Sequence, residues 1–328
     1  MKMKLWGTRG SLPTPENPVN IYNRIELLLE EFLLFSKMDH AQSMNLVESF
    51  LSLKKRCLIS GYGGNTICNE ITSENQKIII DCGSGMRSLG NDLLKGPLGQ
   101  GKGRVDLFIT HFHWDHLIGL PFFVPIYIPG NEIHIYAVQE DLEEIIRSLF
   151  KKPNFPVPFE ELGSQIYFHR LKPREDFSLN NMTVTPYLLD HPDTCWGYRV
   201  QVDNKSISHC VDTEAIRVSR KQLGEDLGLY ENSDVMVFDA QYSFNDHLEK
   251  ANWGHSSSFI GIDLALREKI KKVLFVHHDP VASSEHIYKA YQEAKDYCKL
   301  QIKQLKKNGQ EDAELEVIFA WDGIELEI

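Results

Sequence analysis

A dense group of metal-type ligands directly follows an apolar run, and this arrangement constrains the fold more than any other feature of the chain. Three histidines and an aspartate occupy the six residues from 111 to 116, namely His111, His113, Asp115 and His116. The residues before them, 105–109, are mostly apolar and predict a buried strand. Imidazole and carboxylate groups suit zinc or a similar first-row metal. Because a strand end is rigid and the loop after it can wrap an ion, the stretch predicts a metal site there.

The same arrangement, a histidine or aspartate just past an apolar run, occurs at three later points in the chain. These are His191 after residues 184–189, Asp212 after residues 206–211, and the pair His277 and His278 after residues 273–276. Four such strand ends predict a shared site at one edge of the sheets. Neighbouring residues of an extended strand point to opposite faces, so only one of the adjacent pair is expected to reach the site. By the same alternation, His209 is expected to lie in the core.

Strand-like and helical patterns run through the rest of the chain and predict an α/β layered domain. Strands are expected at residues 77–81, 105–110, 132–137, 182–187, 198–202, 206–211, 235–239, 273–276 and 315–320. Helices are expected at residues 86–94, 140–149, 256–267 and 285–304. The length of 328 residues would allow two domains, but the pattern favours one domain over residues 1–328.

Residues 20–56 differ from this pattern because they contain no glycine or proline. Apolar residues recur there at helical spacing in two groups, which predicts an inserted helical hairpin. Two roles remain open for it. It could serve only for packing, or it could cover the active-site mouth or form a homodimer contact.

Composition narrows the classes of partner and compartment. The net charge of -11 disfavours a broad surface for long nucleic acids. The six cysteines are scattered without a CxxC pair, which is typical of reduced thiols. The first residues lack the apolar core of a signal peptide, and the apolar run at residues 117–128 is too short to span a bilayer. We therefore expect a cytoplasmic protein without a membrane partner.

Several motifs together resemble those of the metallo-β-lactamase-fold hydrolases. His111, His113, Asp115 and His116 match the HxHxDH motif of that superfamily, and His191, Asp212 and His277 match its later ligand motifs in order. The phosphodiesterase branch, which includes tRNase Z and cyclic-nucleotide phosphodiesterases, is the most similar. Six segments of this chain resemble loops of that branch, namely residues 6–11, 63–66, 81–85, 197–199, 239–242 and 254–257. The resemblance covers nearly the whole chain except the insert, and it implies a four-layer αββα sandwich with an inserted helical hairpin.

The resemblance also implies a ligand set for two divalent metal ions. One ion would take His111, His113 and His191, the second would take Asp115, His116 and His277, and Asp212 would bridge them. Zinc is the expected metal, although manganese and iron suit the same donors. Asp81 is expected to brace the metal loop through hydrogen bonds.

The implied chemistry is hydrolysis of a phosphodiester. Two cations lower the pKa of a water between them, so that hydroxide can attack phosphorus. His255 would then be the general acid for the leaving group, Asp239 would orient it, and Asp115 would complete the catalytic residues. Arg9 could contact a phosphate oxygen or form a structural salt bridge. A small phosphodiester is the expected substrate, with a cyclic nucleotide the best example.

Other functions remain open at this stage. A tRNase Z-like RNA 3′-processing endonuclease is the nearest alternative, but the chain lacks the basic, glycine-rich arm typical of that family. A thiolesterase would not need the pair Asp239 and His255, and a β-lactamase would usually carry an export signal. A non-catalytic scaffold would be expected to have lost a ligand, and none is missing.

Overall fold

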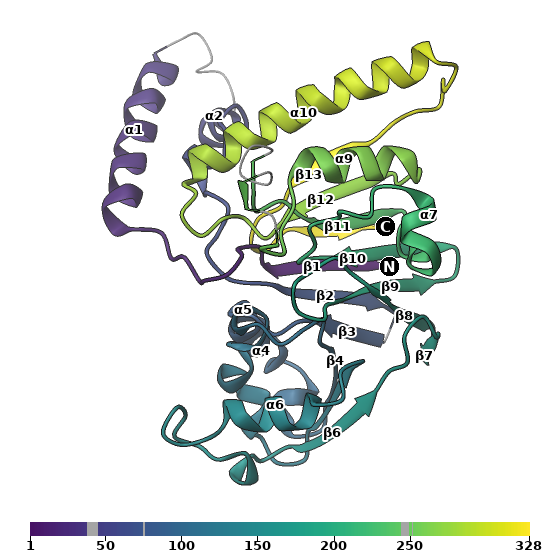
Figure 1. Ribbon diagram of the computed structural model, residues 1–328. Helices are drawn as coiled ribbons and strands as arrows, with labels where there is room; N and C mark the ends of the chain where they lie inside the picture. Colours follow the sequence, from purple (N-terminus) through teal and green to yellow (C-terminus); the bar gives the residue numbers. More distant parts are fainter. Residues whose placement is uncertain (38–44, 75, 244–248, 251) are drawn as a thin grey trace.

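Two seven-stranded sheets pack face to face and carry helices on their outer faces (Figure 1). The computed structural model describes residues 1–37, 45–74, 76–243, 249–250 and 252–328. The first sheet has the order β14-β1-β2-β3-β4-β5-β6 and the second has the order β13-β12-β11-β10-β9-β8-β7. This arrangement confirms the expected four-layer sandwich.

The strands of the first sheet are β1 (Lys2–Gly7), β2 (Cys68–Ser73), β3 (Gln76–Ile80), β4 (Arg104–Phe108), β5 (Glu132–Ala137), β6 (Gln165–Arg170) and β14 (Glu325–Glu327). Those of the second are β7 (Phe177–Leu179), β8 (Met182–Leu188), β9 (Trp196–Val202), β10 (Lys205–Cys210), β11 (Val235–Asp239), β12 (Lys272–Val276) and β13 (Glu316–Phe319). The helices are α1 (Pro18–Ser36), α2 (Leu46–Ser52), α3 (Arg56–Ile59), α4 (Met86–Leu93), α5 (Trp114–Leu117), α6 (Leu142–Leu149), α7 (Arg220–Leu223), α9 (Ser258–Arg267) and α10 (Ser284–Lys307).

Three apolar clusters hold the layers together. The central one joins the two sheets through residues such as Leu5, Ile80 and Tyr198, which are fully buried. A second cluster packs α9 and α10 on the second sheet, and a third packs α4 and α6 on the first. Burial of this much apolar surface is the main force that fixes the order of the layers.

The strand directions bring several loops to one edge. Strands β3 to β6 run parallel, as do β10 to β13. Strand β8 is antiparallel to β9, which is antiparallel to β10, so β8 ends on the same side as β10. The carboxyl ends of parallel strands lie at the same edge of a sheet. The loops that carry the predicted ligands therefore converge.

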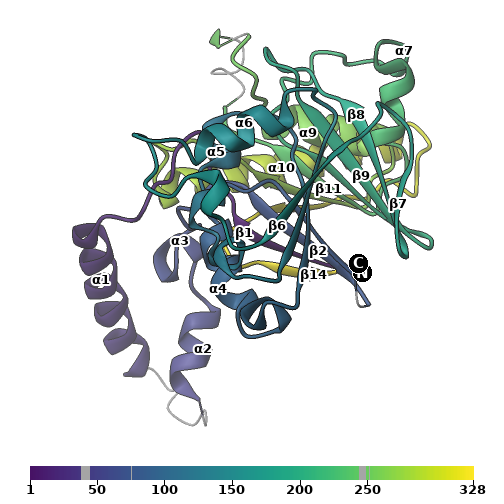
Figure 2. The ribbon, with the colours of Figure 1, turned by 90° about the horizontal axis from the view of Figure 1, so that it is seen from below.

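The inserted segment forms two helices, α1 and α2, which we call the hairpin, and the short helix α3 follows it. The hairpin begins at Pro18, two residues before the expected start, because Asn17 caps it and proline is suited to the first helical turn. The rings of Phe32 and Phe35 lie 5.3 and 5.4 Å from the ring of Phe50 and hold the two helices together. Part of the predicted connection, residues 38–44, lies outside the described residues. The hairpin projects from the body of the molecule (Figure 2).

Five strands do not follow from the sequence patterns: β1, β2, β6, β7 and β14. Strand β1 mixes lysines with apolar residues, and β6 lies at a sheet edge with a polar and aromatic sequence. Their strand conformation depends on pairing with neighbours distant in sequence, which local patterns do not reveal. Of the helices within the described residues, none combines the length and the apolar character needed to cross a membrane.

Candidate metal centre

The backbone turns sharply where three of the strands end. Asp81, Asp212 and His277 directly or almost directly follow β3, β10 and β12, and their φ angles are 61°, 62° and 60°. Non-glycine residues rarely adopt this left-handed conformation, and it costs about 1–3 kcal/mol at each position. Such strain is tolerated where the surrounding contacts fix a functional side chain. Here it marks the edge where the predicted ligands meet.

The predicted ligands form two sets that meet at Asp212. One set is His111, His113, His191 and Asp212, and the other is Asp115, His116 and His277; within each set the candidate ligand atoms lie within 4.8 Å of one another. One carboxylate oxygen of Asp212, Oδ2, lies 3.3 Å from Nε2 of His111. Its other oxygen, Oδ1, lies 3.3 Å from Nε2 of His116 and 3.0 Å from Nε2 of His277. The carboxylate of Asp212 therefore faces both sets at once.

Hydrogen bonds on the far side of the imidazoles fix their orientation. His116 Nδ1 lies 2.8 Å from Oδ2 of Asp81, which is fully buried and also accepts from the backbone N–H of Thr110. His191 Nδ1 lies 2.9 Å from the carbonyl oxygen of Asp193. His113 differs, because its Nε2 lies 2.8 Å from the Asp193 carboxylate and Nδ1 is left for the site. Such outer contacts set the tautomer and direction of metal-binding histidines.

Several atoms that point into the site are buried without a hydrogen-bond partner among the described residues. They are Nε2 of His111, His116 and His191 and Oδ1 of Asp212. Buried polar atoms are almost always satisfied by protein groups, ordered water or a bound ion, so a group of them in one place indicates that something binds there. Imidazole nitrogens and carboxylate oxygens are donors for a divalent cation. The residues present therefore fit a divalent metal site.

The charges of the site also favour a cation. Burial favours the neutral imidazole, yet Asp212 and Asp115 raise the pKa of His277 to about 10. Burial would likewise raise the pKa of Asp212, but His277 and His116 lower it well below its usual value. The carboxylates thus draw positive charge into the site, and a metal ion would supply it.

His278 and His209 are buried near the site but belong to neither set. The side chain of His278 turns away from the site, and its Nε2 lies 2.8 Å from the carbonyl oxygen of Ala320. Burial lowers the pKa of His278 to about 3 and that of His209 to about 4. Strand alternation predicts that only one of the two adjacent histidines reaches the site, and in the structure that residue is His277. His209 is buried, as expected.

His255 and Asp239 lie beside the second set. His255 Nδ1 is 2.9 Å from Oδ2 of Asp239, and the His255 ring stacks on the His277 ring with centroids 4.7 Å apart. Asp239 is fully buried, and its Oδ1 accepts from the backbone N–H groups of Gln241 and Ser256. Asp239 thus holds one nitrogen of His255, and Nε2 is the atom that could exchange a proton with a bound substrate.

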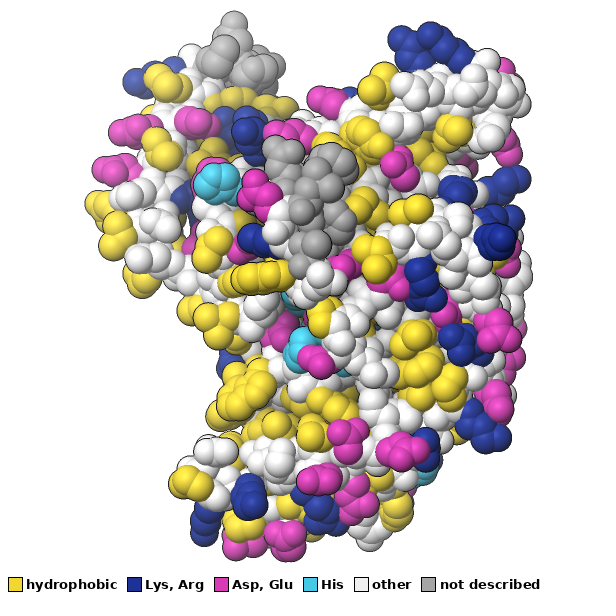
Figure 3. Space-filling model, in the orientation of Figure 1, with side chains coloured by type: hydrophobic (Ala, Val, Ile, Leu, Met, Phe, Trp, Pro, Cys, Tyr) yellow, Lys and Arg dark blue, Asp and Glu magenta, His cyan; other side chains and the backbone are white. Residues whose placement is uncertain are grey.

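A glycine allows the loop that carries His255 to approach the metal ligands. Gly254 has a φ of 87°, and a Cβ at this position would lie 2.3 Å from Cδ2 of His191. The backbone N–H of Gly254 donates to the carboxylate of Glu214 at 2.8 Å. In the view of Figure 3 the surface is hollowed near its centre, and histidine side chains lie in the hollow beside carboxylates.

Some residues that build the site were not identified from the sequence. Asp193 contacts both His113 and His191, and Glu214 holds the loop before His255. Asp322 accepts from the backbone N–H groups of Thr8, Gly64 and Asn65 and so joins the opening loop to the next one. Apart from His191, which is two residues before Asp193, their partners are distant in sequence, so no local pattern marks these carboxylates.

Arg9 takes a role that neither sequence interpretation anticipated. It is buried, and its guanidinium donates to the carbonyl oxygens of Gly63, Asp279 and Ala282. It therefore stabilises the loops around the site and makes no ion pair with a carboxylate among the described residues.

Comparison with known proteins agrees with this geometry. The family model described as "Beta-lactamase superfamily domain" matches residues 76–278. Ribonuclease Z from Staphylococcus carnosus is 24% identical over 177 residues, which cover 50% of this chain and 53% of that protein. Ribonuclease Z from Streptococcus suis is 25% identical over 265 residues, which cover 65% of this chain and 82% of that protein. The chain thus spans only about half of the first of these relatives.

Solved structures share the fold at low sequence identity. The metallo-β-lactamase fold protein YhfI from Bacillus subtilis aligns over 100% of this chain and 98% of its own, with a TM-score of 0.62 and 14% identity. A diphosphatase from the PhnP family aligns over 100% and 97%, with a TM-score of 0.56 and 17% identity. The short form of human tRNase Z aligns over 100% and 99%, with a TM-score of 0.59 and 16% identity. At these identities the similarity establishes the fold alone.

Proposed function

The chain belongs to the β-lactamase superfamily, and from this premise we propose that it is a metal-dependent hydrolase, specifically a dinuclear phosphodiesterase. Its substrate would be a small phosphodiester, with a cyclic nucleotide as the best example. The observation that carries the proposal is the position of Asp212. Its two carboxylate oxygens face separate sets of histidines, as a carboxylate shared by two metal ions would.

We assign His111, His113 and His191 to one ion, Asp115, His116 and His277 to the other, and Asp212 to both. Zinc is the proposed metal, and manganese and iron suit the same donors. When bound, two divalent ions supply an activated water and neutralise the phosphoryl oxygens.

His255 is the proposed general acid. Departure of an alkoxide from phosphorus requires a proton, and a positioned histidine can donate it. Asp239 holds His255 Nδ1 at 2.9 Å and fixes the direction of the ring, so that Nε2 is left to donate the proton. Asp115 has a different role, because its Oδ2 accepts from the backbone N–H of Ser11 at 2.8 Å and ties the opening loop to the second set of ligands.

The charge of the chain supports a small substrate. A phosphodiester carries one negative charge, so the metal centre can hold it without a basic surface, whereas the chain as a whole has a net charge of -11. RNA 3′-processing is the second candidate. The name of the two similar ribonuclease Z proteins supports it to the same degree, because it names RNA as the substrate of those relatives.

A hydrolysis screen with metal-reconstituted protein tests both candidates. The panel would contain 2′,3′- and 3′,5′-cyclic nucleotides, an aryl phosphodiester, an aryl phosphomonoester, a thioester, a β-lactam and precursor tRNA. We expect the fastest turnover with a cyclic nucleotide. Faster cleavage of precursor tRNA would establish the second candidate, and activity confined to the thioester or the β-lactam would refute both.

A further inference from the structure

A cavity of about 320 Å³ lies between the end of the hairpin and α10, apart from the metal centre. Three consecutive cations, Lys54, Lys55 and Arg56, enter it from the chain after α2. Aromatic rings form much of the remaining wall, with Tyr288 and Tyr291 from α10 and Trp321 from the segment after β13. No aspartate or glutamate is among its described lining residues. A cavity lined by cations and aromatic rings without a carboxylate is unusual in a chain with a net charge of -11.

Arg56 is the central cation of this cavity. Its guanidinium carbon lies 3.4 Å from the centre of the Trp321 ring, and its Nη1 lies 3.1 Å from the hydroxyl oxygen of Ser60. Burial lowers the pKa of Arg56, and among the described residues no carboxylate forms an ion pair with it. The Trp321 ring and the Ser60 hydroxyl hold the guanidinium in place without neutralising its charge, so its remaining N–H groups can pair with an anion from outside.

The two lysines add positive charge at the rim. Lys55 is exposed, and its Nζ lies 5.2 Å from the centre of the Tyr288 ring. Lys54 is neutralised in part, because its Nζ lies 2.6 Å from a carboxylate oxygen of Glu31 in α1. Two of the three cations, Lys55 and Arg56, are therefore available to a ligand.

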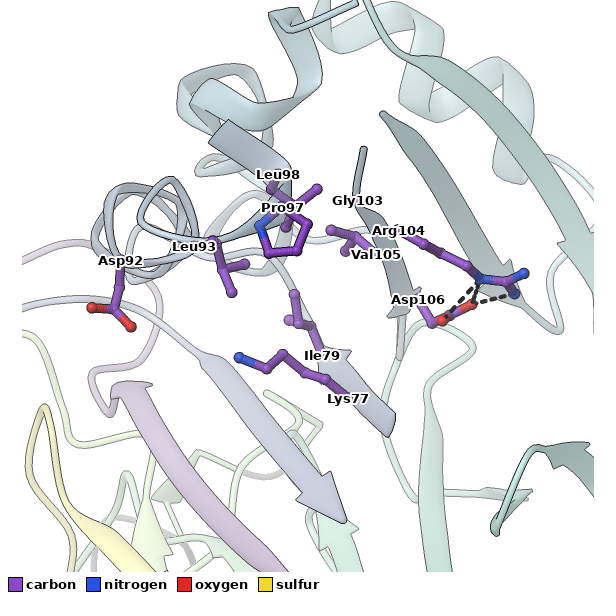
Figure 4. Close-up of a pocket in the computed structure, with 11 residues that line it drawn as sticks. Lys77, Ile79, Asp92, Leu93, Pro97, Leu98, Gly103, Arg104, Val105 and Asp106 are labelled. Carbon is purple, nitrogen blue, oxygen red and sulfur yellow. Dashed lines mark hydrogen bonds and ion pairs between the residues drawn. The ribbon is translucent and has the colours of Figure 1, made fainter. Parts of the chain in front are cut away.

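The cavity shown in Figure 4 provides a contrast within the same molecule. It also contains cations, but Arg104 lies 2.7 Å from a carboxylate oxygen of Asp106, and Lys77 forms an ion pair with Glu70. Those cations already have their counter-charges, and the walls near them are aliphatic, with Ile79 and other apolar residues. That cavity therefore offers neither an unpaired cation nor an aromatic wall.

We infer that the cavity at the end of the hairpin binds a nucleotide, with the phosphate at Arg56 and Lys55 and the base against the tyrosine rings. Guanidinium groups bind phosphate oxygens through paired N–H donors. Bases stack on aromatic side chains regardless of sequence. The volume lies at the lower end of the range for small-molecule pockets and suits one nucleotide. The nucleotide could be free or could be one residue of an RNA strand.

The nucleotide site is separate from the metal centre but adjoins its scaffold. None of the residues in the two ligand sets lines the cavity. One wall residue, Tyr62, is buried, and its ring lies 5.6 Å from the ring of His278, the neighbour of His277 in sequence. Nucleotide binding in the cavity does not depend on the function proposed for the metals. Because a phosphodiesterase would also bind AMP and an oligonucleotide at its metals, binding in the cavity is read from the Asp212→Ala variant beside the wild-type protein.

The test is a binding titration of the metal-loaded protein with AMP, with adenosine, and with a fluorescein-labelled deca-adenylate. Lys55→Gln and Arg56→Gln should each weaken binding of AMP or of the oligonucleotide roughly tenfold, the usual cost of a lost hydrogen bond to a charged group. Arg87→Gln, an equal change of charge at an exposed position of α4, should leave binding unchanged. Asp212→Ala should also bind normally, which would separate this site from the metal centre.

Comparison of AMP with the deca-adenylate distinguishes a free nucleotide from a nucleotide within an RNA strand. Equal affinity for AMP and for the deca-adenylate would assign the site to a free nucleotide, and binding of the oligonucleotide alone would assign it to a strand. Adenosine that binds as tightly as AMP would overturn the assignment, because the cations would then contribute nothing. So would unchanged binding in the Lys55 variant, which alters an exposed side chain and is not expected to affect folding.

Discussion

Replacement of His255 by alanine should slow hydrolysis while leaving the metals in place. The imidazole is held by the buried carboxylate of Asp239 and stacks on the ring of His277, so it is fixed beside the ligands. A positioned general acid contributes about 10²–10⁴-fold to the rate. This range corresponds to roughly 3–5 kcal/mol in the activation barrier. We therefore expect a fall in kcat of that size.

Asp239→Asn should give a smaller loss in the same direction. The asparagine carbonyl can still accept from the backbone N–H groups of Gln241 and Ser256, so the loop should keep its shape. What is lost is the charged hydrogen-bond partner that holds His255 in place. A hydrogen bond to a charged group contributes about 1.5–3 kcal/mol, which corresponds to roughly 10–150-fold in rate.

The assay compares two phosphodiesters that differ in the leaving group. An alkyl leaving group needs the proton from His255, whereas a nitrophenolate departs without it. The effect of His255→Ala should therefore be large on the first substrate and small on the second. Metal content, measured on the same samples, should stay at the wild-type value, and His286→Ala, at an exposed position, serves as the control. Equal losses on both substrates would refute the acid role. Loss of metal from the variant would indicate that His255 is itself a metal ligand.

Three further predictions concern the ligands, the hairpin and stability. Asp212→Ala should reduce bound metal below one ion per chain in elemental analysis, because both sets lose their shared carboxylate. Because α1 buries none of its residues and exposes Ile25 and Leu29, we propose that the hairpin forms a homodimer contact. Ile25→Lys with Leu29→Lys should then lower the mass measured by light scattering from that of a dimer to that of a monomer, whereas Glu26→Lys with Glu30→Lys should not. Asp226→Asn should lower the free energy of unfolding by about 1.5–3 kcal/mol at pH 7, since Arg174 and Arg217 lose a shared carboxylate and keep only Glu225 and Asp190 as ion-pair partners. Those arginines lower the pKa of Asp226 against the effect of burial, so its contribution is present above about pH 4 and should vanish as the pH falls further.

Local patterns predicted an α/β layered domain with a site at one edge of its sheets, and the resemblance of the motifs to the metallo-β-lactamase fold implied the four-layer sandwich and the ligand sets. Each predicted ligand stands just past an apolar run, and the carboxyl ends of the strands bring those positions together. The carboxylates that position the ligands were harder to foresee. Asp193 and Asp322 act on partners that only the fold brings near, and Arg9 binds backbone carbonyls that leave no trace in side-chain identity.

The alternation of side chains along β12 predicts only part of the choice between His277 and His278. Alternation along β12 indicates that only one of the two can face the site, but it does not say which. The structure decides through the backbone, since His277 lies in the left-handed conformation with a φ of 60°. Asp212 adopts the same conformation after β10. A cost of about 1–3 kcal/mol at each position is retained because the two side chains, 3.0 Å apart, lie at the junction of the two ligand sets. The strain and the unsatisfied donors thus coincide, and a metal ion at this junction would account for both.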